Sequence, residues 1–339
     1  MDNYIQNRYD FVFLFDVKDG NPNGDPDFDN QPRIDFETRM GIVSDVCIKR
    51  KVRNYVQLKV EAEKNDEEKQ EKLDPEKYGI FIQQGNILND LINKASQKVG
   101  GDENKGRELM CEKYYDIRTF GAVMSTGDKQ SSEGNNDDSS PEDNKQNKKG
   151  KKSNKRGIGV VRGPVQFTFS RSVDPIDSRT HSLTRCCVVD KDDSTTFGSK
   201  STVSYGLYRM YGYVSAFDGV KCHFTENDLT LLWEALINAF EHDRSAARGE
   251  MNARALIVFK HDSKLGKARS SELFERVRIE KNKDEKGNEI EFPREYSDYI
   301  ITLNKTKLPD GITVLGEKEM KKLYLMQGVT IIDENAKTT

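Results

Sequence analysis

The sequence predicts an α+β fold built on an RRM-like (ferredoxin-like) antiparallel sheet, with helical insertions and one protruding hairpin. Two observations predict this fold. Apolar strand segments and amphipathic helices alternate along the chain as strand, helix, strand, strand, helix, strand. Long polar stretches interrupt the connections between them, which is typical of insertions into a single domain. The 339 residues suit one large elaborated domain or two small ones, and we expect the single domain.

Composition limits which ligands the chain can bind through its overall charge. The net charge is -3 and the pI about 6.0, so contact with a nucleic acid requires a local basic surface. The five cysteines show no CxxC spacing, and neither a signal-peptide pattern nor an apolar run of membrane-spanning length occurs. We therefore expect a reduced, cytoplasmic protein with no membrane partner.

The first strand and the loop after it open the fold. Residues 9–18 include a continuous apolar run, as expected of a central strand that is covered on both faces. The loop reads Asn-Pro-Asn-Gly-Asp-Pro-Asp, and its prolines and Gly24 predict a turn. We expect its backbone amides, including those around Asn21 and Asn23, to remain free.

A basic helix follows the loop. Ser44 is its predicted N-cap, and apolar residues recur through residues 45–56 at the spacing of one buried helical face. Lys49, Arg50 and Arg53 share the adjoining face, and we expect no acidic i+4 partner for them. Cations beside an amide-rich loop suit phosphate groups, whereas the alternative interpretation is a solvated amphipathic helix.

The middle of the chain is predicted to be an elaboration of the core. Residues 57–115 are predicted as a helical insertion, with a polar connector at 61–77 and a helix at 85–99. An apolar segment at 117–124 predicts a strand. Residues 127–156 lack periodic hydrophobic residues and are predicted to be a disordered insertion, whose basic second half either contacts a polyanion or is a solvated loop.

A long polar segment then separates two strands. Residues 174–204 are predicted to form the protruding hairpin, and they carry Arg179, His181 and Arg185 as candidate contacts to a polyanion. The tyrosine-rich strand at 205–217 either stacks on bases or packs within the sheet.

The next segments complete the predicted core. Thr225 is expected to cap an amphipathic helix, and residues 255–260 form the last core strand. Between them, His242 and Asp243 resemble the metal-binding pair of HD phosphohydrolases, but a salt-bridged helix end with Arg248 is the better interpretation.

Metal and catalytic chemistry find little support in the sequence. Residues 19–30 follow part of the calcium-loop spacing, but Asn30 replaces the bidentate glutamate. Asp25, Asp27 and Asp29 are expected to form a solvated turn and not a magnesium site. We find no pairing of a nucleophile with a base. No catalytic residue, metal site or cofactor is therefore predicted.

Several colinear segments together resemble one known family. They are residues 21–27, 45–56, 120–124, 162–176, 205–209, 232–236 and 241–251. These segments are similar to the backbone subunit of type I-C CRISPR Cascade, of the Csd-type RAMP backbone family. The resemblance runs from about residue 9 to residue 308 and leaves out residues 127–156.

The resemblance implies an RRM-like palm with a thumb at residues 174–204, which pushes out guide bases at intervals. It implies that copies stack head to tail along a guide crRNA, with a target DNA strand and other Cascade subunits as further partners. Residues at positions matching the family's RNA contacts are Asn21, Asn23, Gly24, Ser44, Lys49 and Arg53.

We therefore hypothesise a non-catalytic RNA-binding scaffold whose repeated copies sum their phosphate contacts, so that a basic pI is not needed. One alternative is a metal-dependent ribonuclease of the type III backbone kind, acting on target RNA through Asp25 or Asp27. Another is a calcium-binding module.

Overall fold

The computed structural model describes residues 3–65, 72–124, 157–184, 197–320 and 323–333. The predicted contact residue Arg185 and the polar insertion at 127–156 lie outside these residues. Among the described helices, none is both long enough and apolar enough to cross a membrane.

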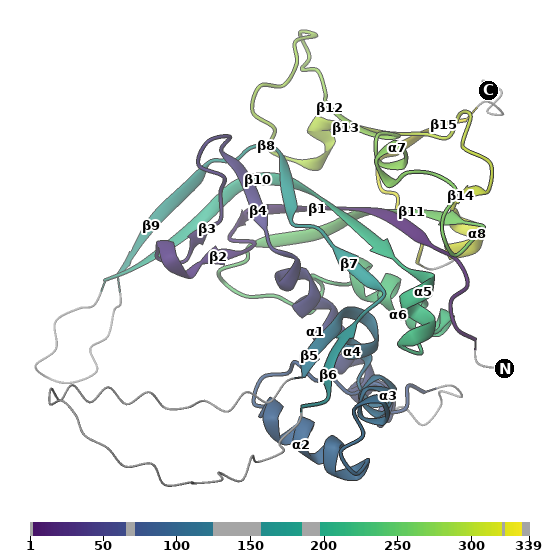
Figure 1. Cartoon of the computed structure of the whole chain (residues 1–339). Helices are drawn as coiled ribbons and strands as arrows, with labels where there is room; N and C mark the ends of the chain where they lie inside the picture. The colour runs from purple at the N-terminus through teal and green to yellow at the C-terminus, as the bar shows by residue number, and fades with distance from the viewer. Residues whose placement is uncertain (1–2, 66–71, 125–156, 185–196, 321–322, 334–339) are drawn as a thin grey trace, which may run out of the picture.

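The core is an antiparallel sheet with strand order β14-β11-β1-β10-β8-β4, to which β7 and β9 add by pairing with β10 (Figure 1). Its strands are β1 (Tyr9–Gly20), β4 (Met40–Val43), β7 (Val165–Phe167), β8 (Ser170–Pro175), β9 (Ser178–Thr184), β10 (Phe197–Val214), β11 (Glu250–His261) and β14 (Ile312–Val314). Helices α1 (Asp45–Lys64) and α6 (Glu226–Ile237) supply the helical layer. The predicted α+β class with an antiparallel sheet is confirmed.

Strand β1 lies at the centre of this sheet and is covered on both faces. Phe11, Phe13 and Phe15 are fully buried in the cluster that contains the apolar faces of α1 and α6. Val12 and Leu14 point to the opposite face and join a second cluster with the C-terminal strands. Burial on both faces explains why this strand is continuously apolar.

Helix α1 is longer than the sequence suggested. The connector was expected to begin at residue 61, but the helix runs to Lys64. Glu63 in the last turn explains the difference, because its buried carboxylate accepts a hydrogen bond from the Leu73 amide at 2.8 Å. Glu234 of α6 also accepts hydrogen bonds from the Tyr55 hydroxyl (2.8 Å) and from Lys59 Nζ. These contacts hold the second half of α1 against α6.

The helical insertion contains α2 (Leu88–Lys98), α3 (Glu103–Lys113), α4 (Tyr115–Phe120) and the hairpin β5 (Gly121–Met124)–β6 (Gly159–Arg162). The predicted strand at 117–124 is wrong in its first half, which is α4. Asp116 and Arg118 explain this, because a strand would place both on one face. In α4, Asp116 instead reaches Arg53 of α1, while Arg118 pairs with Asp228 of α6 at 2.8 Å.

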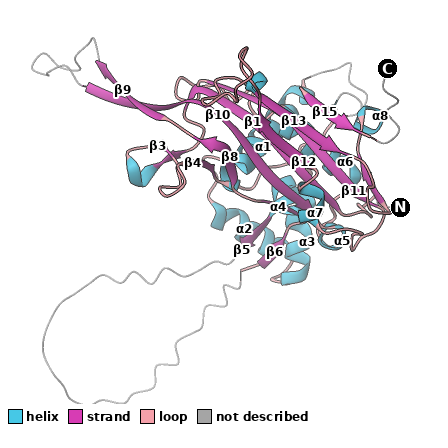
Figure 2. Cartoon of the chain, turned by 90° about the horizontal axis from the view of Figure 1, so that it is seen from above, coloured by secondary structure: helices cyan, strands magenta, loops and turns pink. Residues whose placement is uncertain are grey.

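Strands β9 and β10 form a hairpin that extends beyond the main sheet (Figures 1 and 2). The register runs from Phe197 opposite Thr184 to Val203 opposite Ser178. Beside this hairpin lie β2 (Gly24–Asp25), the 3-10 helix η1 (Pro26–Phe28) and β3 (Gln31–Pro32) (Figure 1), and Asp29 accepts a hydrogen bond from the Ser199 hydroxyl at 3.4 Å.

The C-terminal part covers the other face of the sheet. It consists of β12 (Val277–Lys281), β13 (Tyr299–Asn304) and β15 (Val329–Ile332), with α7 (Ser270–Phe274), η2 (Tyr296–Asp298) and α8 (Glu317–Met320). A short helix, α5 (Ala216–Lys221), precedes α6. Thr225 caps α6 through its side chain, as predicted.

Candidate nucleic-acid interface

The loop after β1 is held in place by its own backbone and side-chain hydrogen bonds. The Asn21 amide donates to the Ala247 carbonyl at 2.8 Å, and Asn21 Nδ2 donates to the Asn30 carbonyl at 2.7 Å. The expectation that the loop amides remain free is therefore wrong for Asn21. Space and not a positive φ favours glycine at position 24, because a Cβ there would force the Asn30 side chain to move.

Asn23 connects this loop to the start of α1. Its Oδ1 accepts hydrogen bonds from both the backbone amide and the hydroxyl of Ser44, each at 2.9 Å. Ser44 occupies the N-cap position as predicted, but its side chain bonds Asn23 and does not cap the helix. Side-chain hydrogen bonds therefore join the loop to the N-terminus of α1.

The predicted cations of α1 do not all face the same surroundings. Lys49 pairs with Asp45 at 2.8 Å and its side chain is only 14% exposed, so the expectation that it lacks an acidic partner is wrong. Arg53 Nε pairs with Asp116 at 2.8 Å. Arg50 is exposed, and within the described residues it makes no ion pair.

A groove of about 1440 Å³ lies beside α1. We call it the α1 groove; its walls are α1, the loop before it, residues 80–88 and β5. Four arginines line it, namely Arg33, Arg50, Arg53 and Arg248, and no aspartate or glutamate of the described chain does. Its volume exceeds that of a pocket for one small molecule, so the groove suits an extended anionic ligand.

Acidic residues outside the groove orient three of these arginines. Arg33 pairs with Asp25 at 3.3 Å, and Arg248 pairs with Asp243 at 3.1 Å. Together with the Arg53–Asp116 pair, these contacts use only part of each guanidinium. Because a guanidinium has five N–H donors, each arginine keeps donors for a ligand in the groove.

A smaller cavity of about 300 Å³ adjoins the groove and contains the predicted loop residues Asn21 and Gly24. The two cavities share Asn23, Cys47, Arg50 and Arg248. Burial raises the pKa of the Cys47 thiol, so this side chain stays neutral beside the cations.

Comparison with known proteins gives the family. The model of the family "CRISPR-associated protein Cas7" matches residues 7–304. The chain belongs to the Cas7 family. A Cas7 protein of Haloferax volcanii is 26% identical to this Cas7-family chain over 249 residues, which cover 68% of this chain and 65% of that protein.

Two solved structures resemble this Cas7-family chain at 12% sequence identity. One is titled "CRISPR RNA-guided surveillance complex", with a TM-score of 0.39 over 74% of this chain and 68% of that chain. The other is titled "CRISPR RNA-guided surveillance complex, pre-nicking", with a TM-score of 0.42 over 74% of this chain and 75% of that chain.

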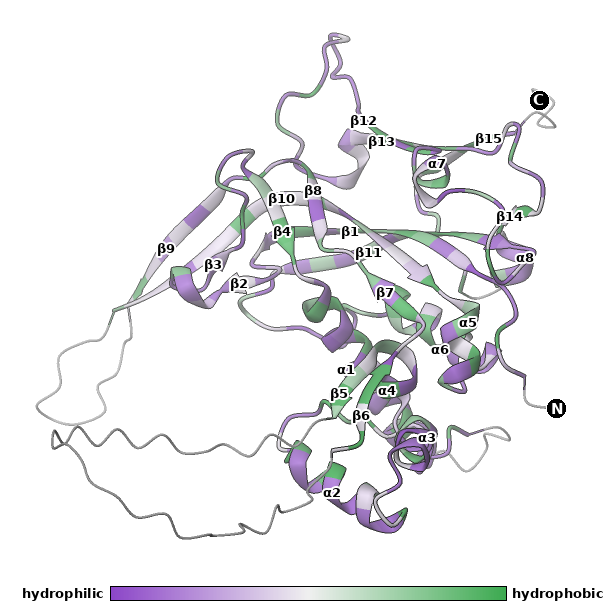
Figure 3. Ribbon diagram, viewed as in Figure 1, coloured by the Kyte–Doolittle hydropathy of each residue, from purple (hydrophilic) through white to green (hydrophobic). Residues whose placement is uncertain are grey.

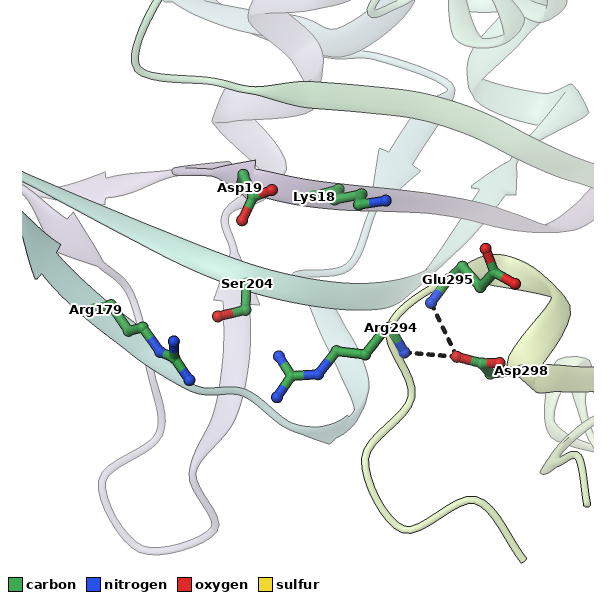
Figure 4. Close-up of a pocket in the computed structure, with 7 residues that line it drawn as sticks. All are labelled: Lys18, Asp19, Arg179, Ser204, Arg294, Glu295 and Asp298. Carbon is green, nitrogen blue, oxygen red and sulfur yellow. Dashed lines mark hydrogen bonds between the residues drawn. The ribbon is translucent and has the colours of Figure 1, made fainter. Parts of the chain in front are cut away.

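The hairpin residues of this Cas7-family chain lie apart from the α1 groove. His181 Nε2 is 3.0 Å from Thr202 Oγ1, and Arg179 pairs with Asp177 at 2.9 Å. Arg179 lines another cavity, of about 530 Å³, beside η2 (Figure 4). The other residues that line this cavity beside η2 are Lys18, Asp19, Ser204, Arg294, Glu295 and Asp298. Its cations and carboxylates are equal in number, so it lacks the positive character of the groove.

Sequence reasoning missed two groove arginines of this Cas7-family chain and the network behind them. Arg33 precedes β4, and Arg248 lies in the segment expected to be a salt-bridged helix end. The expected salt bridges form in this segment, as Arg244–Glu241 and Arg248–Asp243, but the segment is not a helix end, because α6 already ends at Ile237. Asp243 also binds Lys51 of α1. That contact brings Arg248 to the groove, and no local pattern indicates it.

Proposed function

We propose that this Cas7-family chain is a non-catalytic RNA-binding scaffold that polymerises along the guide crRNA of a type I-C CRISPR interference complex. The single observation that carries this proposal is the α1 groove, which four arginines line without an acidic residue among the described lining residues. A single-stranded RNA presents a regular row of phosphates to such a surface.

The fold suits this function in two further ways. The antiparallel sheet with α1 and α6 serves as an RRM-like palm, and the β9–β10 hairpin serves as a thumb that interrupts the guide at intervals. Head-to-tail copies place their grooves in series, so phosphate contacts add up although each chain has a net charge of only -3. Base pairing between guide and target DNA then supplies sequence specificity.

Colinear sequence segments support the proposed type I-C subtype. The loop at residues 21–27 and the helix motif at 45–56 resemble type I-C backbone subunits. In this proposal Asn23, Ser44, Arg50 and Arg53 contact the guide directly. Asn21 and Gly24 shape the adjoining cavity.

Lys49 and the predicted contact residues of the hairpin have smaller roles in this proposal. Lys49 is not among the groove-lining residues, so its charge acts only at a distance. Arg179 and His181 act from the thumb together with Arg185, which lies outside the described residues.

The alternative ribonuclease activity has less support. Asp25 accepts a hydrogen bond from the Asp27 amide at 3.2 Å and pairs with Arg33, so it already has a cationic partner. A Mg²⁺ site at Asp25 would need further oxygen ligands close to this carboxylate.

A combined binding and cleavage assay tests the proposal. The purified full chain is incubated with a labelled guide RNA and a complementary RNA in Mg²⁺. We expect salt-dependent binding of unrelated guide sequences with equal affinity, and an intact complementary strand. Discrete cleavage products that Asp25→Ala or Asp27→Ala abolishes would overturn the scaffold function.

A further inference from the structure

Apolar side chains line the α1 groove beside its arginines. Val46 in the first turn of α1 is 62% exposed, Ile82 is 46% exposed, and Val123 of β5 is 70% exposed. Phosphate groups gain nothing from such neighbours, because their oxygens require hydrogen-bond donors or water. Phosphate binding alone therefore leaves these three residues, which we call the apolar wall, without a role.

The hairpin that supplies part of this wall is apolar on its exposed side as well. Strands β5 and β6 are coloured as hydrophobic where they lie beside α1 (Figure 3). Val160 of β6 lies opposite Val123 in the register and is 61% exposed, but it does not line the groove. The chain thus offers two exposed valines on neighbouring strands, of which only one reaches the groove.

We propose that nucleobases of the bound strand cover the apolar wall while the arginines hold its phosphates. This inference rests on the proposed function and adds a second contact type to the same groove. A single-stranded nucleic acid alternates phosphates with flat apolar bases, so one ligand satisfies both kinds of lining residue.

The charge of the groove favours this occupant over an apolar protein segment. Such a segment would bury the wall but would also bury Arg50 without a counter-charge, which is costly. The remaining polar lining supports bases as well, because the amides of Gln83 and Gln84 offer both donors and acceptors to base edges. Contact with base faces tolerates any sequence, as a guide scaffold requires.

Two probes separate base contacts from phosphate contacts. One is a short single-stranded RNA of mixed sequence, and the other is an abasic ribose-phosphate strand of the same length and charge. Fluorescence anisotropy gives the affinity of the full chain for each. We expect the wild-type chain to bind the abasic strand about tenfold more weakly, since it loses the burial of the wall.

The double variant Val46→Ser/Val123→Ser removes two of the three residues of the apolar wall. Both residues are largely exposed, so the fold tolerates the change. We expect the variant to bind RNA severalfold more weakly than the wild type does, because only Ile82 of the wall remains, and its affinity for the abasic strand to be unchanged. The matched control Val160→Ser changes an equally exposed valine outside the groove and should bind both probes like the wild type.

Different outcomes contradict different claims. Equal binding of the two probes by the wild type, or unchanged RNA affinity of the double variant, would overturn the base contacts. The base contacts would also be overturned if the double variant kept its affinity for short RNA but no longer assembled into several copies. The apolar wall would then contact a neighbouring protein copy. If Arg50→Ala still lowers the salt dependence of binding, the proposed function survives; if it does not, the proposed function fails as well.

Discussion

Arg50 is the residue on which phosphate binding depends most directly. It lines both the α1 groove and the adjoining cavity, and it makes no ion pair within the described residues. The three other groove arginines already share their charge with aspartates. The full charge of Arg50 is therefore available to a ligand.

Arg50→Ala should weaken RNA binding equally for unrelated sequences. The slope of log affinity against log salt should fall by about one unit, because one phosphate contact is lost. Fluorescence anisotropy over a salt series measures this slope. Arg244→Ala is the matched control, since Arg244 is exposed and pairs with Glu241 outside the groove. An unchanged slope in the Arg50 variant would exclude Arg50 from phosphate contact.

Cys47 reports on occupancy of the groove. Burial raises the pKa of its thiol, so at neutral pH its thiolate fraction is below that of an ordinary cysteine. Alkylation by a maleimide should therefore be slow, should accelerate as the pH rises toward that pKa, and should slow further when RNA is bound. Peptide mass spectrometry resolves Cys47 from the other cysteines. Equal rates with and without RNA would show that the ligand lies elsewhere.

At the residue scale, the sequence identified part of the site. Arg50 and Arg53 could be predicted because a helical period places them on one face beside the loop. Lys49 shares that face, but Asp45 one turn earlier neutralises it. Arg33 and Arg248 could not be predicted, because only the folded sheet brings their distant segments to α1.

Asp116 joins three elements around the groove. Its carboxylate is buried and accepts hydrogen bonds from the amides of Phe81 (2.8 Å) and Ile82 (3.0 Å), while Arg53 Nε donates at 2.8 Å. Helix α4 thereby fixes one wall of the groove to α1. This one side chain therefore ties residues 80–88 to α1.

Asp116→Ala should lower the free energy of unfolding by about 3–5 kcal/mol, since it leaves two amides and a guanidinium without their acceptor. Urea denaturation measures the change. Asp177→Ala removes an exposed pair with Arg179, and should cost under about 1 kcal/mol. Equal stability of the two variants would mean that Asp116 does not hold the walls together.

The β5–β6 hairpin allows residues 127–156 to be shortened. Met124 lies opposite Gly159 in its register, so the two ends of the connection meet. Replacement of 127–156 by a short Gly-Ser linker should leave the melting temperature nearly unchanged, because loop length costs little. Differential scanning fluorimetry measures it. A large decrease would indicate that the segment contributes to the fold.

Among the elements, those with an unbroken local pattern could be predicted. The apolar run of β1 and the period of α6 predict both elements, because β1 is buried over Tyr9–Val17 and α6 buries one face. Helix α4 could not be predicted, since its six residues are too few to show a period. The contacts of Arg118 and Asp116 with other elements decide its conformation.

At the scale of the whole molecule, function depends on where charge is placed and not on its total. The net charge is -3, yet the α1 groove collects four arginines and excludes carboxylates among its described lining residues. The cavity beside η2 is lined by equal numbers of cations and carboxylates. A polyanion should therefore bind in the α1 groove and not in the cavity beside η2. Head-to-tail copies should strengthen this preference, because their contacts with one ligand add up.

Photocrosslinking tests the central claim most directly, because it shows which cavity the RNA occupies. The full chain is bound to a 4-thiouridine-containing single-stranded RNA and irradiated, and the crosslinked peptides are sequenced by mass spectrometry. We predict crosslinks in the N-terminal half of α1, in residues 80–88 and in β5. Crosslinks confined to Arg179, Arg294 and their neighbours would contradict it.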